Sequence, residues 1–307
     1  METLRDLLQE RTIRGELWKP EKDGIRCFAC GHRCFIPEGR DGICKVRSND
    51  HGELKVPWGY VAGIQVDPSE KKRFFGVFPG GRAVSFGRLG CDFHCAYCQN
   101  WMTSQALRDV DAAALPRDIS PDDLVALAKR SGIKVMTSTY NEPLITSEWA
   151  VEVFKKAKPL GIYGSYVSNG NATPEVLEYI RPWVDFYKID LKSFDDKHYR
   201  QLGGVLKNVT DSIERVYKMG FWLEIVSLLI PGFNDDPAEI RSMCEFIKSV
   251  SPDIPWHATA YHQDYKMRDR DRTPAETLLR AGEIAREVGL NFVYLGNIHG
   301  GVGDWES

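Results

Sequence analysis

A repeating order of short apolar segments, amphipathic segments and glycines runs from residue 83 to near the end of this chain. Apolar segments of strand length occur at 83–86, 135–139, 162–168, 186–191, 222–230, 256–261 and 292–295. Segments with helical spacing lie between them, at 121–131, 147–158, 174–181, 209–219, 237–250 and 274–288. Strands that alternate with helices predict parallel βαβ units, because a parallel connection needs a crossover of about helix length.

Residues that start and stop helices support these boundaries. Ser120, Thr173 and Thr273 each precede a proline, which is the order expected at a helix start. Glycines stand where a helix would end before the next strand, at Gly132, Gly161, Gly220 and Gly289. About six such units plus a last strand are fewer than the eight of a closed barrel. The sequence therefore predicts an α/β fold with a partial parallel (β/α)6 barrel.

The first 80 residues have a different character. They are rich in glycine, charge and cysteine, with short alternating segments such as 53–56, and Leu4, Leu7, Leu8 and Ile13 indicate a short amphipathic helix near the start. Pro79-Gly80-Gly81 marks a turn-rich seam. We therefore predict a small cysteine-rich metal- or cluster-binding region over 1–80 and the barrel over 81–307.

The composition of the chain limits the cell compartments and the classes of partner that we expect. The chain has 307 residues and a formal net charge of −3, which gives no bulk argument for nucleic acid or an anionic membrane. No apolar run approaches the ~18 residues of a membrane span, and residues 1–20 lack the apolar centre of a signal peptide. Seven of the eight cysteines form two clusters, and Cys244 stands alone in a helical segment, as a core cysteine would. We expect a cytoplasmic protein whose clustered thiols are ligands rather than disulfides.

The densest cysteine cluster follows the first predicted strand. Cys91, Cys95 and Cys98 have the spacing Cys-x3-Cys-x2-Cys, with the aromatic Tyr97 before the last cysteine. Three thiolates can hold a four-iron cubane and leave one iron open to chelate a small molecule. The alternative is a zinc site of these three cysteines completed by His94.

Polar or charged residues follow the other predicted strands. Because the carboxyl ends of parallel strands share one edge of a barrel, we expect these side chains to gather there. Each one alone has an ordinary explanation as a capping or solvated residue, and Asp190 with Lys192, on one face of their strand, as a surface ion pair. Their recurrence after every strand favours a binding site. The residues are Glu142, Ser168, Asn169, Asp190, Lys192, Asn234 and His257.

A second cysteine cluster lies near the start of the chain. Cys27, Cys30, Cys34 and Cys44 supply four thiolates, with glycines between them that permit tight bends. A closed structural zinc site is the first interpretation. A second iron–sulfur cluster remains open as an alternative, as does an empty or redox-active set of thiols.

Together these motifs resemble radical S-adenosylmethionine (SAM) enzymes of the pyruvate formate-lyase activating type, which activate glycyl-radical enzymes. The closer resemblance is to the radical SAM protein of the AmmeMemoRadiSam system. The N-terminal cysteine cluster (Cys27 to Cys44) and the segment Asp-Pro-Ser-Glu-Lys-Lys (67–72) also resemble that protein. The resemblance therefore covers nearly the whole chain. The other motifs are Gly-Cys-Asp-Phe-His-Cys-Ala-Tyr-Cys-Gln-Asn-Trp (90–101), Thr-Tyr-Asn-Glu-Pro (139–143), Ser-Asn-Gly (168–170), Ile-Asp-Leu-Lys (189–192), Pro-Gly-Phe-Asn-Asp (231–235), Pro-Trp-His (255–257) and Tyr-Leu-Gly-Asn (294–297).

One feature of that subfamily is missing. A further Cys-x-x-Cys tail is common in its members, but here Gly-Val-Gly-Asp-Trp-Glu-Ser (301–307) follows the Gly-Asn step. A truncated chain and a member without the tail are the two alternatives, and a site shared between the two ends of the chain is in doubt.

The resemblance also implies a role for each residue. Cys91, Cys95 and Cys98 would hold a [4Fe-4S] cluster, and SAM would chelate the open iron through its amino and carboxylate groups. The SAM contacts would be Tyr97 beside the cluster, Glu142 at the ammonium, Ser168 and Asn169 near the ribose and carboxylate, Asp190 and Lys192 near the methionine part, Asn234 near the adenine, and His257.

The implied reaction is reductive cleavage of SAM to methionine and a 5′-deoxyadenosyl radical, which abstracts hydrogen from a substrate. An electron donor such as flavodoxin or ferredoxin would supply the electron. The substrate is a protein glycine in one interpretation, and a different protein, a small molecule or a nucleic acid in another. The alternatives to this reaction are a non-catalytic iron–sulfur or zinc interaction module and a zinc hydrolase that uses the Cys91 loop and His257.

Overall fold

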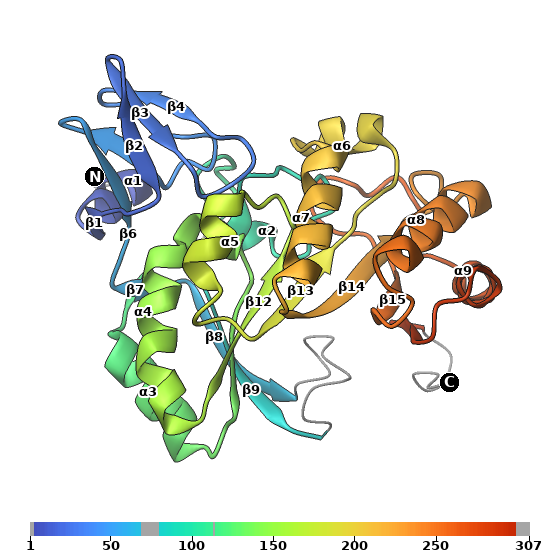
Figure 1. The fold of residues 1–307 in the computed structure, drawn as a ribbon. Coiled ribbons are helices and arrows are strands. Elements are labelled where there is room, and N and C mark those ends of the chain that lie inside the picture. The colour runs from blue at the N-terminus through green and yellow to red at the C-terminus, as the bar shows by residue number, and fades with distance from the viewer. Residues whose placement is uncertain (1–2, 69–79, 113, 299–307) are drawn as a thin grey trace.

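The computed structural model describes residues 3–68, 80–112 and 114–298 (Figure 1). Its centre is an eight-stranded sheet in the order β16-β15-β14-β13-β12-β11-β9-β8. Seven of these strands are parallel and correspond to the seven predicted strands. They are β9 (Arg82–Gly87), β11 (Val135–Ser138), β12 (Tyr163–Ser168), β13 (Phe186–Asp190), β14 (Trp222–Leu229), β15 (Trp256–Ala260) and β16 (Val293–Gly296).

The pairing at the two edges of this sheet shows whether the barrel is open or closed. The eighth strand, β8 (Gly63–Pro68), pairs antiparallel with β9 at one edge, and β16 lies at the other. No pairing joins β16 to β8 or β9 in the described ranges. The predicted partial barrel is therefore confirmed, with β8 as an antiparallel addition that the sequence analysis missed.

Helices follow the strands and lie side by side along one face of the sheet (Figure 1). They bury their apolar faces on it, as the ring centroids of Phe86 in β9 and Trp149 in the helix after β11, 5.5 Å apart, illustrate. The helices that the sequence predicted are α3 (Pro121–Arg130), α4 (Ser147–Ala157), α5 (Pro174–Ile180), α7 (Leu206–Lys218), α8 (Pro237–Val250) and α9 (Ala275–Val288). Four short helices were not predicted, namely α2 (Trp101–Ser104), α6 (Asp196–Leu202), η2 (Pro143–Thr146) and η3 (Lys158–Leu160).

The helix-start predictions are right at two positions and wrong at one. Ser120 and Thr173 accept backbone hydrogen bonds from the first turns of α3 and α5. Thr273 does not cap α9, which begins at Ala275. Its hydroxyl instead accepts from the Tyr261 N–H at 2.8 Å and donates to the Leu229 carbonyl at 2.6 Å. The Thr273 hydroxyl therefore links the ends of β14 and β15 instead of capping the helix.

The N-terminal region folds into small antiparallel sheets. One contains β1, β6 and β5, another β2, β3 and β4, and β7 pairs with β10. The expected amphipathic helix is α1, and the alternating segment at 53–56 falls in β6. The bounds are α1 (Leu4–Gln9), β1 (Thr12–Arg14), β2 (Trp18–Glu21), β3 (Gly24–Cys27), β4 (Phe35–Pro37), β5 (Ser48–Asp50), β6 (Glu53–Pro57), β7 (Tyr60–Val61) and β10 (Arg117–Asp118).

This region is fixed to the barrel by buried polar contacts. Arg88, which follows β9, donates to the carbonyls of Tyr60 and Pro57 at 2.9 and 2.6 Å. Its guanidinium lies 4.4 Å from the Tyr60 ring centre and 4.5 Å from that of Trp149, and burial lowers its pKa to about 10. Such cation–π contacts are strongest where water is excluded. Arg88 therefore ties the N-terminal sheets to the start of the Cys91 loop.

The predicted boundary at residue 81 falls between β8 and β9, two strands that pair with each other. The central sheet therefore contains strands from both sides of the predicted boundary. The division of the chain at residue 80 stays a prediction. Pro79, residues 69–72 and the tail at 301–307 lie outside the described residues. Within the described ranges, no helix has both the length and the apolar character needed to cross a bilayer.

Candidate active site

The Cys91–Cys98 loop follows the carboxyl end of β9, and the glycines before it pack closely against Thr139 and Val46. A Cβ on Gly87 would lie 2.3 Å from the Thr139 carbonyl oxygen. Gly90 has φ +89°, and a Cβ there would lie 2.8 Å from Val46. Only glycine combines that φ with so little space. The sequence signal for the sharp turn into the loop is therefore the glycine directly before Cys91.

The three thiols of this loop are largely enclosed. Cys95 is buried, and Cys91 and Cys98 are half-buried. Burial raises the pKa of all three thiols, that of Cys95 to about 12. The Phe93 N–H donates to Cys91 Sγ at 3.4 Å, and Cys98 Sγ lies 3.2 Å from the Ser104 hydroxyl. Ligand binding would take the protons from these thiols, because only thiolates bind metal.

The spacing of the thiols tests the zinc alternative. Within the described part of the chain, no three of the Cys91, Cys95 and Cys98 sulfurs and the His94 ring nitrogens lie within 4.8 Å of one another. Ligand sulfurs around zinc are about 3.8 Å apart, since Zn–S bonds are about 2.3 Å in a tetrahedron. The His94 ring instead lies against Gly203, where a Cβ would be 2.5 Å from it. A cubane spaces its thiolates more widely, because each binds a different iron, so these residues fit a cubane better than zinc.

Glu142, after β11, is held beside the cysteine loop by neighbouring strand ends. Its carboxylate accepts from the Ser168 hydroxyl at 2.7 Å, the Asn169 N–H at 2.8 Å and the Leu144 N–H at 3.1 Å. Burial and the nearby Asp92 carboxylate raise its pKa to about 8. The structure thus brings Glu142, Ser168 and Asn169 together as predicted, at the carboxyl ends of β11 and β12.

Two residues that the sequence analysis did not single out complete this cluster. Asp92 is fully buried, and its two carboxylate oxygens accept from the amides of Asn169 at 2.7 Å and Asn171 at 2.8 Å. The Asn169 amide nitrogen also lies 4.0 Å from Cys91 Sγ. The available signals were their positions, since Asp92 stands inside the cysteine motif and Asn171 directly follows Ser-Asn-Gly.

Asp190 and Lys192 form the predicted pair at the end of β13. Lys192 Nζ lies 3.3 Å from Asp190 Oδ2, with little of the lysine side chain exposed. Burial alone would lower the pKa of Lys192, but the Asp190 carboxylate outweighs it and the pKa is raised. The ammonium therefore stays charged beside Cys95, whose pKa it lowers against the effect of burial. The pair belongs to the cysteine loop and not to the outer surface.

Tyr97 is buried against the loop that follows β14. Its ring centroid lies 5.9 Å from that of Phe233 in a T-shaped arrangement, and burial raises its pKa. Its hydroxyl has no hydrogen-bond partner among the described residues. A buried hydroxyl without a partner is costly, so a polar ligand that bound beside it would offset this cost.

Asn234 is enclosed by its own loop. Its side chain accepts from the Ile230 N–H at 2.7 Å and donates to the carbonyls of Lys192 at 2.7 Å and Leu228 at 2.9 Å. A direct hydrogen bond to an adenine would have to replace one of these contacts. The geometry gives Asn234 the task of positioning Lys192 and the 230–235 turn, and the predicted proximity to adenine stays a prediction.

His257 is the second residue of β15 and does not stand at the strand end, where the sequence analysis placed it. It pairs in register with Val226, which pairs with Asp190, so it lies level with the end of β13. Its Nε2 lies 2.7 Å from Glu224 Oε2, and its ring stacks 4.9 Å from that of Tyr294. Its contact with SAM stays a prediction.

The N-terminal cysteines surround the turn between β3 and β4. Cys27, Cys30 and Cys44 are buried, Cys34 is half-buried, and the Cys27 N–H donates to the Cys34 carbonyl at 2.9 Å. Burial and the mutual repulsion of the thiolates raise the pKa of Cys30, Cys34 and Cys44, the last to about 12. The four thiols thus lie in one group that is suited to a ligand which displaces protons. Cys244 belongs to neither group and is fully buried in α8, as predicted.

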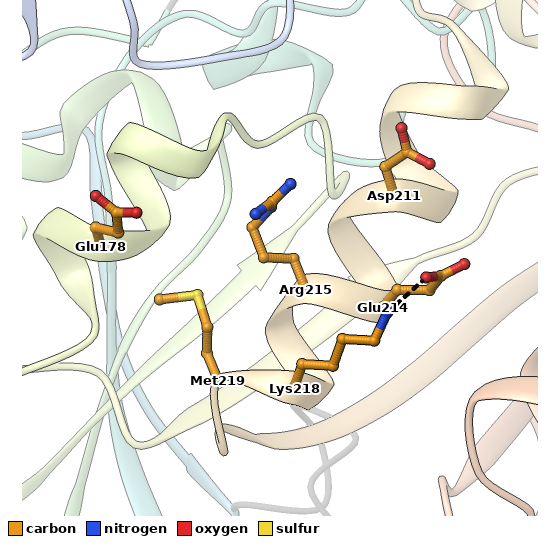
Figure 2. A pocket seen from close by; sticks show the side chains of 6 residues that line it. All are labelled: Glu178, Asp211, Glu214, Arg215, Lys218 and Met219. Carbon is orange, nitrogen blue, oxygen red and sulfur yellow. Dashed lines mark hydrogen bonds and ion pairs between the residues drawn. The ribbon is translucent and has the colours of Figure 1, made fainter.

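A separate hollow lies on the outside of the barrel between α5 and α7 (Figure 2). It measures about 370 Å³, and charged side chains on the two helices dominate its lining. No residue of the candidate site lines it, so the active site lies elsewhere. The lining residues are Glu178, Asp211, Glu214, Arg215, Lys218 and Met219.

Comparison with known proteins agrees with this fold. Residues 89–247 match the model of the radical SAM superfamily. An uncharacterized protein of Methanocaldococcus jannaschii is 32% identical over 93% of this chain and 85% of its own length. The pyruvate formate-lyase-activating enzyme of Staphylococcus aureus is 26% identical over 60% of this chain and 76% of its own. The fold is similar to that of Streptococcus suis SuiB bound to its precursor peptide SuiA, with a TM-score of 0.55, 15% identity, and coverage of 70% of this chain and 48% of that one.

An open parallel barrel with a three-cysteine loop at the carboxyl end of its first parallel strand defines the class of protein. The chain belongs to the radical SAM superfamily and is similar to pyruvate formate-lyase-activating enzymes. The radical SAM superfamily uses a [4Fe-4S] cluster, SAM and a reductant.

Proposed function

We propose that this protein is an enzyme that binds a [4Fe-4S] cluster at Cys91, Cys95 and Cys98 and cleaves SAM there. The observation that carries the proposal is the position of the Cys91 loop, which lies among the predicted SAM-binding residues at the carboxyl ends of β11, β12 and β13. When bound, the cluster supplies one electron to the sulfonium of SAM, whose cleavage gives methionine and a 5′-deoxyadenosyl radical that takes a hydrogen atom from the substrate.

The chain's own residues would bind and orient SAM in this reaction. Glu142 offers a carboxylate for the ammonium of SAM, on a scaffold that Ser168 and Asn169 hold rigid. The paired Asp190 and Lys192 offer both charges to the methionine part. The unsatisfied Tyr97 hydroxyl offers a further polar contact beside the cysteines. The burial of Glu142 and Tyr97 excludes water there, which strengthens polar contacts and protects a reactive radical.

For the substrate, we propose a backbone glycine of a partner protein, as in activation of a glycyl-radical enzyme. The similarity to pyruvate formate-lyase-activating enzymes supports this choice. The motifs that resemble the AmmeMemoRadiSam radical SAM protein support the alternative of a different protein, a small molecule or a nucleic acid. A flavodoxin or ferredoxin is the proposed electron donor, and the clustered free thiols support a reducing cytoplasmic location.

An anaerobic SAM-cleavage assay tests the proposal. The protein is reconstituted with iron and sulfide, reduced with dithionite and incubated with SAM, and 5′-deoxyadenosine is measured. We expect product from the parent and from the Cys244→Ala control, and none from Cys95→Ala. Zinc-filled, colourless protein that binds no SAM would refute the proposal and favour the non-catalytic module. If the parent cleaves SAM, a glycyl-radical signal on an added partner protein would identify that protein as the substrate.

A further inference from the structure

We propose that Cys27, Cys30, Cys34 and Cys44 bind a second four-iron cluster, which passes single electrons to the site at Cys91, Cys95 and Cys98. This inference rests on the proposed function of the Cys91 site. It replaces the structural zinc that the sequence favoured at the N-terminal cysteines, and it gives the N-terminal region a task in the reaction.

The spacing of the four N-terminal sulfurs favours a cubane over zinc. In the ranges that the structure describes, which include all four cysteines, no three of these sulfurs lie within 4.8 Å of one another. A tetrahedral zinc site would bring all four to about 3.8 Å, since its Zn–S bonds are about 2.3 Å. The thiols are nevertheless grouped, since Cys30 and Cys44 each interact electrostatically with the other cysteines of the set. Four thiols that are grouped, but not as closely as a tetrahedral zinc site requires, match a cluster whose corners are four separate irons.

The two cysteine sets are in direct backbone contact. Gly90, directly before Cys91, packs on the backbone of Cys44, so that a Cβ on Gly90 would lie 2.9 Å from the Cys44 carbonyl oxygen. The Gly90 φ of +89° lets the chain make this approach. No layer of side chains therefore separates the two sets at this point.

A second bridge runs through buried amides. The Gly31 N–H, directly after Cys30, donates to the Asn171 carbonyl at 2.8 Å. The Asn171 side-chain amide donates to Asp92, directly after Cys91, at 2.8 Å. Two hydrogen bonds thus join the residues that follow Cys30 and Cys91. This arrangement would hold two clusters at a fixed separation in a dry interior.

The N-terminal set also has one side toward solvent. Cys34 is half-buried, whereas Cys27, Cys30 and Cys44 are each at most 6% exposed. An electron carrier would therefore meet the cluster at Cys34. One electron would pass from a reduced flavodoxin or ferredoxin to this cluster, then to the cluster at Cys91, and finally to the sulfonium of SAM. The relay step oxidises one cluster and reduces the other, and no bond forms or breaks in it. Zinc has no redox chemistry and cannot perform this step.

The first test is the metal content of the full chain after anaerobic reconstitution. We expect about eight irons per chain in the parent and in Cys244→Ala, because each cubane holds four. Cys30→Ala should retain about half of the iron, and so should the triple alanine variant at Cys91, Cys95 and Cys98. One zinc together with about four irons in the parent would overturn the proposal.

The second test is the magnetic interaction between the clusters. Electron paramagnetic resonance of the fully reduced parent should show splitting or broadening from two neighbouring paramagnetic clusters. Each single-cluster variant should give the simple signal of an isolated cluster. A parent spectrum equal to the sum of the two variant spectra would overturn the close arrangement.

The third test compares two reductants in the SAM-cleavage assay. Cys30→Ala should lose flavodoxin-driven cleavage to a much greater extent than dithionite-driven cleavage, since dithionite is small enough to reduce the Cys91 site directly. An unchanged ratio of the two rates would overturn the relay. Failure of the parent with dithionite would instead refute the proposed function, so the two failures are distinguishable.

A variant that keeps every cysteine guards against misfolding of Cys30→Ala. In Gly31→Ala, the new Cβ would lie 2.2 Å from Asn171 Oδ1, which forces the bridge between the sites to shift. We expect full iron content with a weaker magnetic interaction. Gly63→Ala is the matched control, since its Cβ would meet no atom closer than 3.6 Å. Full iron content with the parent spectrum in Gly31→Ala would exclude a role for this bridge.

Discussion

Arg47 and Glu148 form a bidentate ion pair, with two N–O distances of 2.7 Å, between the N-terminal cysteine region and α4 of the barrel. The side chains are 1% and 2% exposed. Arg47 also donates to the Ile145 carbonyl at 3.0 Å, and the Glu148 carboxylate accepts from the Glu16 N–H at 3.3 Å. Backbone partners on both sides reduce the cost of burying two charges. The pair therefore fixes the N-terminal cysteines against the sheet that carries the Cys91 loop.

Removal of one partner of this pair should destabilise the protein strongly. Glu148→Gln leaves the Arg47 charge buried without its counterion, which costs about 3–5 kcal/mol of unfolding free energy. Burial tends to raise the pKa of Glu148, but Arg47 outweighs it and the pKa is lowered. The stability from this pair is therefore present above the ordinary pKa of about 4.5 and is lost as the pH falls through the lower folded value. Anaerobic denaturant titration measures the loss.

The control for this prediction lies on the same helix. Among the described residues, Glu152 of α4 makes only a long ion pair with Lys155, at 4.0 Å, and both side chains are more than one-third exposed. Glu152→Gln should change the unfolding free energy by less than about 0.5 kcal/mol. Equal effects of the two substitutions would refute the role assigned to the Arg47–Glu148 pair.

SAM binding should release a proton from Glu142. Burial and Asp92 raise the pKa of this carboxyl from 4.5 to about 8, so the SAM-free protein holds its proton at pH 7. The ammonium of SAM favours the carboxylate, so SAM affinity should increase as the pH rises toward about 8 and then level off. Calorimetry in buffers of different ionisation enthalpy should detect uptake of about one proton by the buffer at pH 7.

The raised pKa of Glu142 also predicts how the folding stability of the SAM-free protein depends on pH. The folded protein keeps a proton on Glu142 that the unfolded chain has already lost, so stability should decrease as the pH rises from 4.5 to about 8. Glu142→Gln has no such proton and should abolish both pH dependences. A variant that keeps the parental proton release on SAM binding would contradict the assignment to Glu142.

Much of the fold could be predicted because a parallel sheet leaves a repeating record in the sequence. Each buried strand is a short apolar segment, and Gly132, Gly161, Gly220 and Gly289 all have positive φ at the predicted helix ends. The short α6 was missed because its seven residues are mostly polar and show no apolar period. The antiparallel β8 was missed because edge pairing depends on the partner strand more than on the edge segment itself.

The site was predictable in its location but not in its contacts. Parallel strands place their carboxyl ends together, so Glu142, Ser168 and Asp190 could be assigned to one edge from the order of segments alone. The hydrogen bond from Asn171 to Asp92 joins residues 79 positions apart, and no local sequence pattern connects them. The sequence likewise could not reveal that Asn234 uses its amide within its own loop.

Asn234→Ala should destabilise the 230–235 turn and weaken SAM binding together. The substitution leaves the Ile230 N–H and the carbonyls of Lys192 and Leu228 without their partner. We expect a loss of about 2–3 kcal/mol in unfolding free energy, because buried backbone groups without partners cost about 1–3 kcal/mol. Calorimetric titration with SAM should show a larger Kd than in the parent. Asp235→Ala serves as the control for SAM binding, since the one hydrogen bond of Asp235 in the described part of the chain is from the exposed Gly232 N–H. An equal increase in Kd in this variant would contradict the special role of Asn234.

Tyr97→Phe separates ligand binding from folding. The Tyr97 hydroxyl is buried without a partner among the described residues, so its removal should leave the SAM-free protein as stable as the parent or up to about 1 kcal/mol more stable. If SAM fills the space beside the hydroxyl, the same variant should bind SAM more weakly, because a ligand hydrogen bond is lost. Tyr199→Phe is the contrasting variant, since its hydroxyl accepts from the Lys192 N–H at 3.0 Å and its loss should lower stability. Tyr97→Phe protein with lower stability and unchanged SAM affinity would show that the hydroxyl serves the fold and not the ligand.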